Sequence, residues 1–142
     1  MSAEQPETTT HVFPGTGDDA PRTPGDDAPA GEETGAAQAA RDLADVSSVE
    51  LITTVGVHLL SAAALRCGLA EDGDRHQDLD EARTIINALA GMVTAAAPDL
   101  GDTHARALRD GLRSVQLAFR EASVVPDAPG EGPGEKYTGA VR

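Results

Sequence analysis

The sequence predicts an all-α protein, with a small three-helix core between a disordered acidic N-terminal tail and a disordered C-terminal tail. Apolar residues in the middle of the chain recur every three or four positions, as on one face of a helix. The flanking stretches are rich in Pro and Gly, and the first is also rich in acidic residues. We therefore divide the chain into a tail over 1–45, a helical domain over 46–125 and a second tail over 126–142.

The N-terminal tail has a composition typical of disorder. Its first 45 residues carry ten acidic residues and two arginines. So few apolar side chains cannot offset the entropy lost when the backbone is ordered. We interpret this tail as solubilising, with a docking peptide as the alternative. Near its end, the stretch AAQAARDLA suits a short, fraying helix or a helical linker.

The first core helix is predicted from Ser47 to about Gly68. Ser47 and Glu50 fit a capping box, and Gly68 can adopt the left-handed conformation that ends helices. This helix has two apolar seams instead of one. The first consists of Val49, Ile52, Gly56, Leu59 and Ala63. The second consists of Leu51, Val55, His58, Ala62, Leu65 and Leu69. Such a helix is either buried between neighbours or shared with another chain.

Two further helices are predicted, each with a single apolar face. The second begins at the cap Asp78 and runs to about Ala96, because Pro98 is expected to stop it. Its face holds Leu79, Ala82, Ile85, Ile86, Leu89, Val93 and Ala96. The third is capped by Asp102 or Thr103 and runs to about Ser123. Its face holds Leu108, Leu112, Val115, Phe119 and Ala122.

The last 17 residues, PDAPGEGPGEKYTGAVR, are predicted to be disordered. Three Pro and four Gly in so short a stretch leave little chance of regular structure. No basic, leader-like segment opens the chain, and the run from Leu51 to Leu65 without Asp, Glu, Lys or Arg is shorter than the roughly 20 apolar residues of a bilayer span. We expect a cytoplasmic protein that does not enter membranes.

The charge of the chain bears on its partners. The formal net charge is −13, from 24 acidic and 11 basic residues. A nucleic-acid backbone and an anionic membrane surface both require clustered positive charge. Aromatic residues are also too scarce for base stacking. We therefore expect no direct binding to nucleic acid.

The sequence offers little catalytic or metal-binding chemistry. The four histidines do not show the spacing of metal ligands, and Cys67 is the only cysteine. His58 is predicted to be a hydrogen-bonded interior histidine, ahead of a pH switch or a catalytic base. Cys67 is predicted to be a structural thiol. No glycine-rich phosphate loop is present. We predict no metal, no cofactor and no enzymatic activity.

The small core predicts a protein partner. Much of it is Ala, and domains of this size bury a small share of their surface. Self-association through the second seam of the first helix would cover Leu51, Val55, His58 and Leu65, and a different protein would serve equally. Arg106, Arg113 and Arg120 repeat every seven residues, so they share one face of the third helix. This face is either solvated or a docking stripe for an acidic partner.

Four blocks of the sequence resemble a known family. SSVELITTVGVHLLSAAALRCGLAED, DLDEARTIINALAGMVTAAAP, LRDGLRSVQLAFREAS and PDAPGEGPGEKYTG are similar to a domain-of-unknown-function family of small helical proteins from high-GC Gram-positive bacteria. The resemblance implies a cytoplasmic helical protein, with genes near those for translation initiation and ribosomal proteins. It also implies a functional role for the last block, in which Tyr137 is the candidate anchor in a partner pocket.

These observations favour a non-enzymatic interaction module that self-associates through the first core helix. The first alternative is an accessory factor of the translation apparatus, acting through the arginines of the third helix. The second alternative is an enzyme whose site forms only in an oligomer, from His58, His104 and nearby acids.

Overall fold

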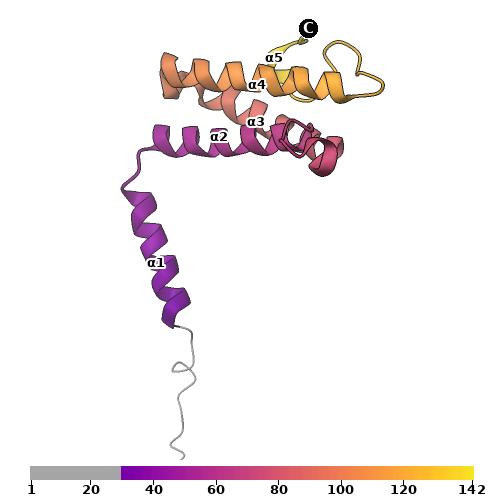
Figure 1. Ribbon diagram of the computed structural model, residues 1–142. Coiled ribbons are helices and arrows are strands. Elements are labelled where there is room, and N and C mark those ends of the chain that lie inside the picture. Colours follow the sequence, from indigo (N-terminus) through magenta and orange to yellow (C-terminus); the bar gives the residue numbers. More distant parts are fainter. Residues whose placement is uncertain (1–29) are drawn as a thin grey trace, which may run out of the picture. The chain divides into compact units, whose positions relative to one another are not determined.

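The computed structural model describes residues 30–142 of the chain, and it confirms the all-α prediction for that part. Its helices are α1 (Ala30–Ala44), α2 (Ser48–Arg66), the 3₁₀ helix η2 (Gly73–His76), α3 (Leu79–Leu100), α4 (Asp102–Ala122) and α5 (Glu135–Thr138) (Figure 1). Most of the predicted acidic tail, residues 1–29, lies outside the described residues. Its last part forms α1.

Helix α1 is a unit of its own, separate from the unit that begins at Ala44. All its side chains from Gly35 to Ala44 are exposed. The Gln38 amide donates a hydrogen bond to Asp42 Oδ1 at 3.0 Å, one turn further along. Alanine has the highest helix propensity of the residues, which explains an isolated helix in this stretch. The predicted helical linker is therefore present and is longer than the stretch AAQAARDLA.

Helix α2 begins and ends where the sequence predicts. The Ser47 hydroxyl accepts a hydrogen bond from the Glu50 N–H at 3.1 Å, which satisfies one of the free amides of the first turn. Cys67 follows the last helical residue, and Gly68 then adopts a φ of +88°. The loop carrying η2 returns to α2, because the Asp78 N–H donates to the Arg66 carbonyl at 2.9 Å.

The junction between α3 and α4 corrects two predictions. Pro98 does not stop α3, which continues to Leu100. Pro98 is exposed, while Ala97 and Leu100 on the same turn are buried, so packing holds the last turn in spite of the missing N–H. The residue preceding α4 is Gly101, with φ of +81°, and neither predicted side chain caps the helix. A single glycine can reverse the chain here because it lacks a Cβ.

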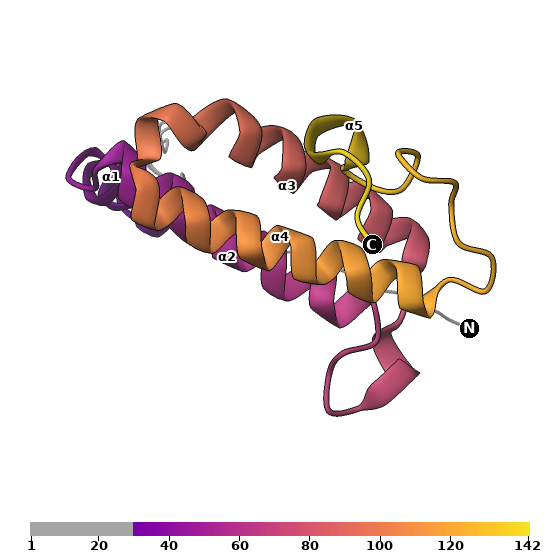
Figure 2. The same cartoon turned by 90° about the horizontal axis from the view of Figure 1, so that it is seen from above.

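Helices α2, α3 and α4 form the predicted three-helix core (Figure 2). The predicted faces of α3 and α4 point inward. The largest fully buried side chains are Ile86, Leu89 and Val93 of α3 with Leu108 and Leu112 of α4. From α2 the core receives Ala63, together with the partly buried Val49, Ile52 and Leu59, as its first seam predicts.

Helices α2 and α4 approach closely through two reciprocal leucine–glycine contacts. A Cβ placed on Gly56 of α2 would lie 2.7 Å from Leu108 Cδ2 of α4. A Cβ on Gly111 of α4 would lie 2.6 Å from Leu60 Cδ1 of α2. Each helix therefore places a leucine over a glycine of the other. Glycine inside a helix is unfavourable by about 1 kcal/mol relative to Ala, and this close packing offsets that cost.

The prediction of a disordered C-terminal tail is wrong. Residues 126–142, which we call the C-terminal strap, turn back over α3 and α4 and include α5 (Figure 2). Pro133, Gly134, Glu135 and Val141 are buried. Composition suggested disorder because the strap has few apolar residues. It is held instead by hydrogen bonds to side chains of α3 and α4.

Candidate functional site

The outer face of α2 carries an apolar row that the rest of its folded unit, residues 44–142, leaves uncovered. We define the outer seam as Leu51, Val55, His58, Ala62 and Leu65. Leu51 is 38 % exposed and Val55 is 39 % exposed, while Ala62 and Leu65 are half-buried. Beyond the helix, Leu69 continues the row with 61 % exposure. The second seam predicted from the sequence is therefore a surface of the folded unit.

His58 lies at the centre of the outer seam. It is exposed, and its side chain forms no hydrogen bond with another described residue. The prediction of a hydrogen-bonded interior histidine is therefore wrong for the single chain. An apolar row is buried only if another segment packs on it. Helices α3 and α4 pack on a different side of α2, so the row that contains His58 stays exposed.

By length and mean hydropathy alone, α2 is also a helix that could cross a membrane. An 18-residue stretch of this 19-residue helix has a mean hydropathy of 1.5, and 11 % of that stretch is buried. The face toward α4 nevertheless contains the two close contacts of Gly56 and Leu60. A helix embedded in lipid would have to leave those contacts. Whether α2 is regarded as a helix packed on α4 or as a helix able to cross a membrane, it exposes apolar side chains such as Leu51 and Val55.

The C-terminal strap is fixed by polar side chains of two helices. Asn87 Oδ1 of α3 accepts a hydrogen bond from the Gly134 N–H at 2.7 Å. The buried Gln116 amide of α4 donates to the Pro133 carbonyl at 3.0 Å and to Thr138 Oγ1 at 3.1 Å. Buried amides form hydrogen bonds because leaving them unpaired costs free energy. These bonds give the strap a single docked position.

Within the strap, Glu135 acts as an internal brace. Its side chain is buried, and Oε1 accepts a hydrogen bond from the Gly130 N–H at 2.7 Å. The neighbouring Tyr137 packs its ring against Gly91 of α3, where an added Cβ would lie 3.3 Å from Cζ. The Tyr137 ring remains 44 % exposed. Tyr137 thus contacts its own chain, and whether it also anchors a partner stays a prediction.

The arginines of α4 occupy one side of that helix without ion pairs. Arg106 and Arg113 are exposed and Arg120 is half-buried. Among the described residues, Arg83 forms an ion pair with Asp127 at 2.8 Å, and His76 Nε2 lies 3.7 Å from Asp72 Oδ2. Arg113 Nη2 donates to the Arg142 carbonyl at 3.3 Å. Within residues 35–142, none of the three arginines pairs with a carboxylate, and both interpretations of this face, solvated or docking, stay open.

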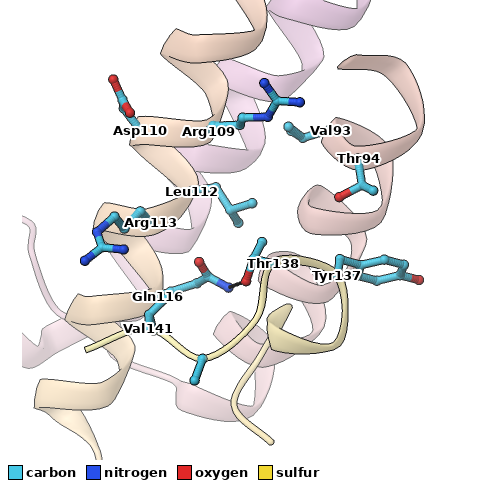
Figure 3. Close-up of a pocket in the computed structure, with 11 residues that line it drawn as sticks. Val93, Thr94, Arg109, Asp110, Leu112, Arg113, Gln116, Tyr137, Thr138 and Val141 are labelled. Carbon is cyan, nitrogen blue, oxygen red and sulfur yellow. Dashed lines mark hydrogen bonds between the residues drawn. The ribbon is translucent and has the colours of Figure 1, made fainter. Parts of the chain in front are cut away.

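A pocket of about 420 Å³ lies between α3, α4 and the C-terminal strap. Val93 and Leu112 contribute apolar walls from the two helices. Figure 3 shows Arg109 reaching from α4 toward Val93 and Thr94, while Gln116 joins Thr138 on the strap. The lining also includes Asp110 and Arg113 of α4, with Tyr137, Ala140 and Val141 of the strap. The docked strap thus forms one wall of the pocket.

Cys67 is a buried thiol at the end of α2, as predicted. Its Sγ lies 3.9 Å from the Val115 carbonyl, to which the thiol donates. Burial raises the pKa of the Cys67 thiol, so the unreactive protonated form is favoured. In residues 35–142, His, Cys, Asp and Glu side chains form no group of three or more able to hold a metal ion.

Comparison with known proteins identifies the helical core. The family model described as "Domain of unknown function (DUF1844)" matches residues 48–121, more than half of the chain. The chain belongs to this family. Neither the curated proteins nor the solved structures compared with it gave a match. The matched stretch begins with α2 and ends one residue before the end of α4, so the C-terminal strap lies beyond it.

The residues that build the pocket of this DUF1844 domain were mostly missed by sequence reasoning. Arg109 is not part of the seven-residue arginine repeat, and Gln116 lies next to the apolar face of α4. Asn87, which holds the strap without lining the pocket, has no feature that distinguishes it from a surface residue of α3. Sequence reasoning did single out Arg113 and Tyr137, which both line the pocket, although for other roles. Gly91, a glycine inside a helix, was a further signal, because such a glycine often marks a close approach by another segment.

Proposed function

We propose that this DUF1844 protein is a non-enzymatic interaction module that forms a two-fold dimer through the outer seam of α2. The observation that carries the proposal is an exposed apolar row with steps of four, three, four and three residues between Leu51 and Leu65. This is the spacing with which one helix packs along another. Leaving Leu51 and Val55 in water costs the folded chain free energy that a second helix would recover.

The charge distribution on α2 permits a second copy of this chain as the partner. The chain has a net charge of −13, so two copies repel over most of their surfaces. Helix α2 carries only Glu50 and Arg66 as charged residues, near its two ends. The outer seam is thus a face where two acidic copies can meet without bringing like charges together. A row along one helix is complementary to itself under two-fold rotation, which is the commonest symmetry of dimers.

Light scattering of the purified full chain, coupled to size-exclusion chromatography, tests the proposal with matched variants. Val55→Asp places a charge in the outer seam. Val57→Asp makes the same substitution on the same helix at a residue that is 51 % exposed. Two positions on a helix turn by about 200°, so Val57 lies outside the seam. We expect a mass of two chains for the natural protein and for Val57→Asp, and one chain for Val55→Asp.

Two results would contradict the dimer. One is a single-chain mass for the natural protein up to high micromolar concentration. The other is a dimer that survives Val55→Asp unchanged. Flotation with liposomes, run on the same samples, separates a membrane partner from a second copy: a monomer that floats with vesicles would move the assignment of the outer seam to lipid. As a further check, His58→Leu should tighten a dry helix–helix contact.

A further inference from the structure

We infer that the pocket between α3, α4 and the C-terminal strap is a binding site for a small monocarboxylate with a short apolar body. This inference concerns residues that the outer seam of α2 does not share. The pocket volume, about 420 Å³, falls within the range of roughly 300–1,000 Å³ typical of small-molecule sites. Its walls are partly apolar, with a few polar groups, which is the usual composition of such sites.

Arg109 supplies the reason to expect an anion. Its guanidinium extends from α4 across the opening toward α3 (Figure 3), and it forms no ion pair with any carboxylate among the described residues. A guanidinium presents a planar fork of N–H donors that matches the two oxygens of a carboxylate. The hydroxyl of Thr94, which also lines the pocket, is a further donor.

The other side chains restrict the charge and the body of the ligand. Asp110 also lines the pocket, and its carboxylate would repel a dianion more strongly than a monoanion. Arg113 already donates to the Arg142 carbonyl, so it adds positive charge but has one donor engaged. Val93 and Leu112 offer an aliphatic surface, and the exposed Tyr137 ring points away from α4 in Figure 3. A short aliphatic chain fits this lining better than a stacked base.

The strap makes this a built site. Gln116 is 2 % exposed and ties Thr138 to α4 at 3.1 Å, which holds the wall of the pocket formed by the strap. Val141 is buried at the same wall. A ligand that touches both the helices and the strap would stabilise the docked strap, because binding to one conformation shifts the equilibrium toward it. Binding is therefore linked to strap docking.

Nuclear magnetic resonance titration of the full chain with hexanoate tests the inference. Hexanamide is the neutral control and hexyl phosphate is the dianionic control. We expect saturable shifts of the Thr94 and Thr138 amides with hexanoate, weaker effects with hexyl phosphate and none with hexanamide. Arg109→Gln should weaken hexanoate binding at least about tenfold, because it removes the charged donors, whose hydrogen bonds are stronger than those between neutral groups. Arg109→Lys keeps the positive charge but loses the planar fork of N–H donors. Its affinity for hexanoate should therefore lie between those of the natural protein and Arg109→Gln.

Arg75→Gln is the matched control, because it removes the same charge from the exposed helix η2, away from the pocket. It should leave hexanoate binding unchanged. The inference is overturned if hexanoate gives no saturable shifts at those amides, if hexanamide binds as well, or if Arg75→Gln weakens binding as much as Arg109→Gln. Tighter binding of hexyl phosphate would overturn the choice of a monocarboxylate.

Discussion

Replacing Gly134 by alanine tests whether the C-terminal strap is docked as described. Gly134 has φ of +76°, and an added Cβ would lie 2.8 Å from Ala90 Cβ and 3.0 Å from Gln116 Nε2. The left-handed conformation costs a non-glycine residue about 1–2 kcal/mol. Overpacking adds about 1–3 kcal/mol, because the Ala90 Cβ is fixed to a buried helix and cannot rotate away. The strap should therefore lose about 2–5 kcal/mol of docking free energy.

Gly130→Ala is the control for this experiment. Gly130 lies in the same strap with φ of +88°, but a Cβ there would have no neighbour within 4 Å. It should lose only the conformational part, about 1–2 kcal/mol. Hydrogen exchange of the strap amides reports the difference, because each 1.4 kcal/mol lowers protection about tenfold. Equal protection in Gly134→Ala, Gly130→Ala and the natural chain would show that the strap is not packed on Ala90 and would refute the reasoning.

Three further predictions address the strap and the core. Gln116→Leu should lower the free energy of unfolding by about 1–3 kcal/mol in urea titrations, because the buried Pro133 carbonyl loses its donor. Asp127→Asn should cost less than about 1 kcal/mol, and less at high salt, because the ion pair with Arg83 is partly exposed. Burial raises the pKa of the Cys67 thiol above its ordinary value, so the protonated thiol makes its full contribution to stability at neutral pH. As pH rises further, the unfolded chain ionises first and stability falls; Cys67→Ala should remove this part of the alkaline decline in urea midpoints.

The helical core could be predicted from the sequence because its signals are local. Ser47 and Asp78 cap α2 and α3 through contacts that span three residues, Ser47 with Glu50 and Asp78 with Glu81. The spacing of Leu108, Leu112 and Phe119 predicts which side of α4 is buried, and all three side chains are buried in the structure. These features depend on residues within one or two turns, where the physical rules are strong.

The end of α3 and the start of α4 were predicted less well, because local rules compete there with packing. Pro98 disfavours the helix locally, but Leu100 gains enough burial to keep the last turn. Asp102 and Thr103 are good capping residues, but the tight reversal at Gly101 already fixes the backbone. The tertiary contacts decide both boundaries, and they involve residues that one helix alone does not show.

The strap and its pocket could not be predicted from local composition. A segment with four glycines and three prolines looks disordered when the test is apolar content. Its actual partners, Asn87 and Gln116, are 47 and 17 residues away from the strap positions they contact. Single polar residues at such separations leave no periodic signal. The block PDAPGEGPGEKYTG lies beyond the stretch that the family model matches, so the functional role that its resemblance implied stays a prediction.

The strap also sharpens the interpretation of α2. A small, alanine-rich core exposes some apolar surface in any case, so the exposure of Leu51 and Val55 alone is weak evidence for a partner. Within residues 44–142, however, the strap covers the α3–α4 side, including the buried Val141, and the outer seam of α2 is left open. The outer seam also has the spacing of four and three residues that is typical of helix–helix packing, and α2 has no Asp, Glu, Lys or Arg between Leu51 and Leu65. The coincidence of these three properties on one helix is what supports the proposed helix–helix dimer over incidental exposure.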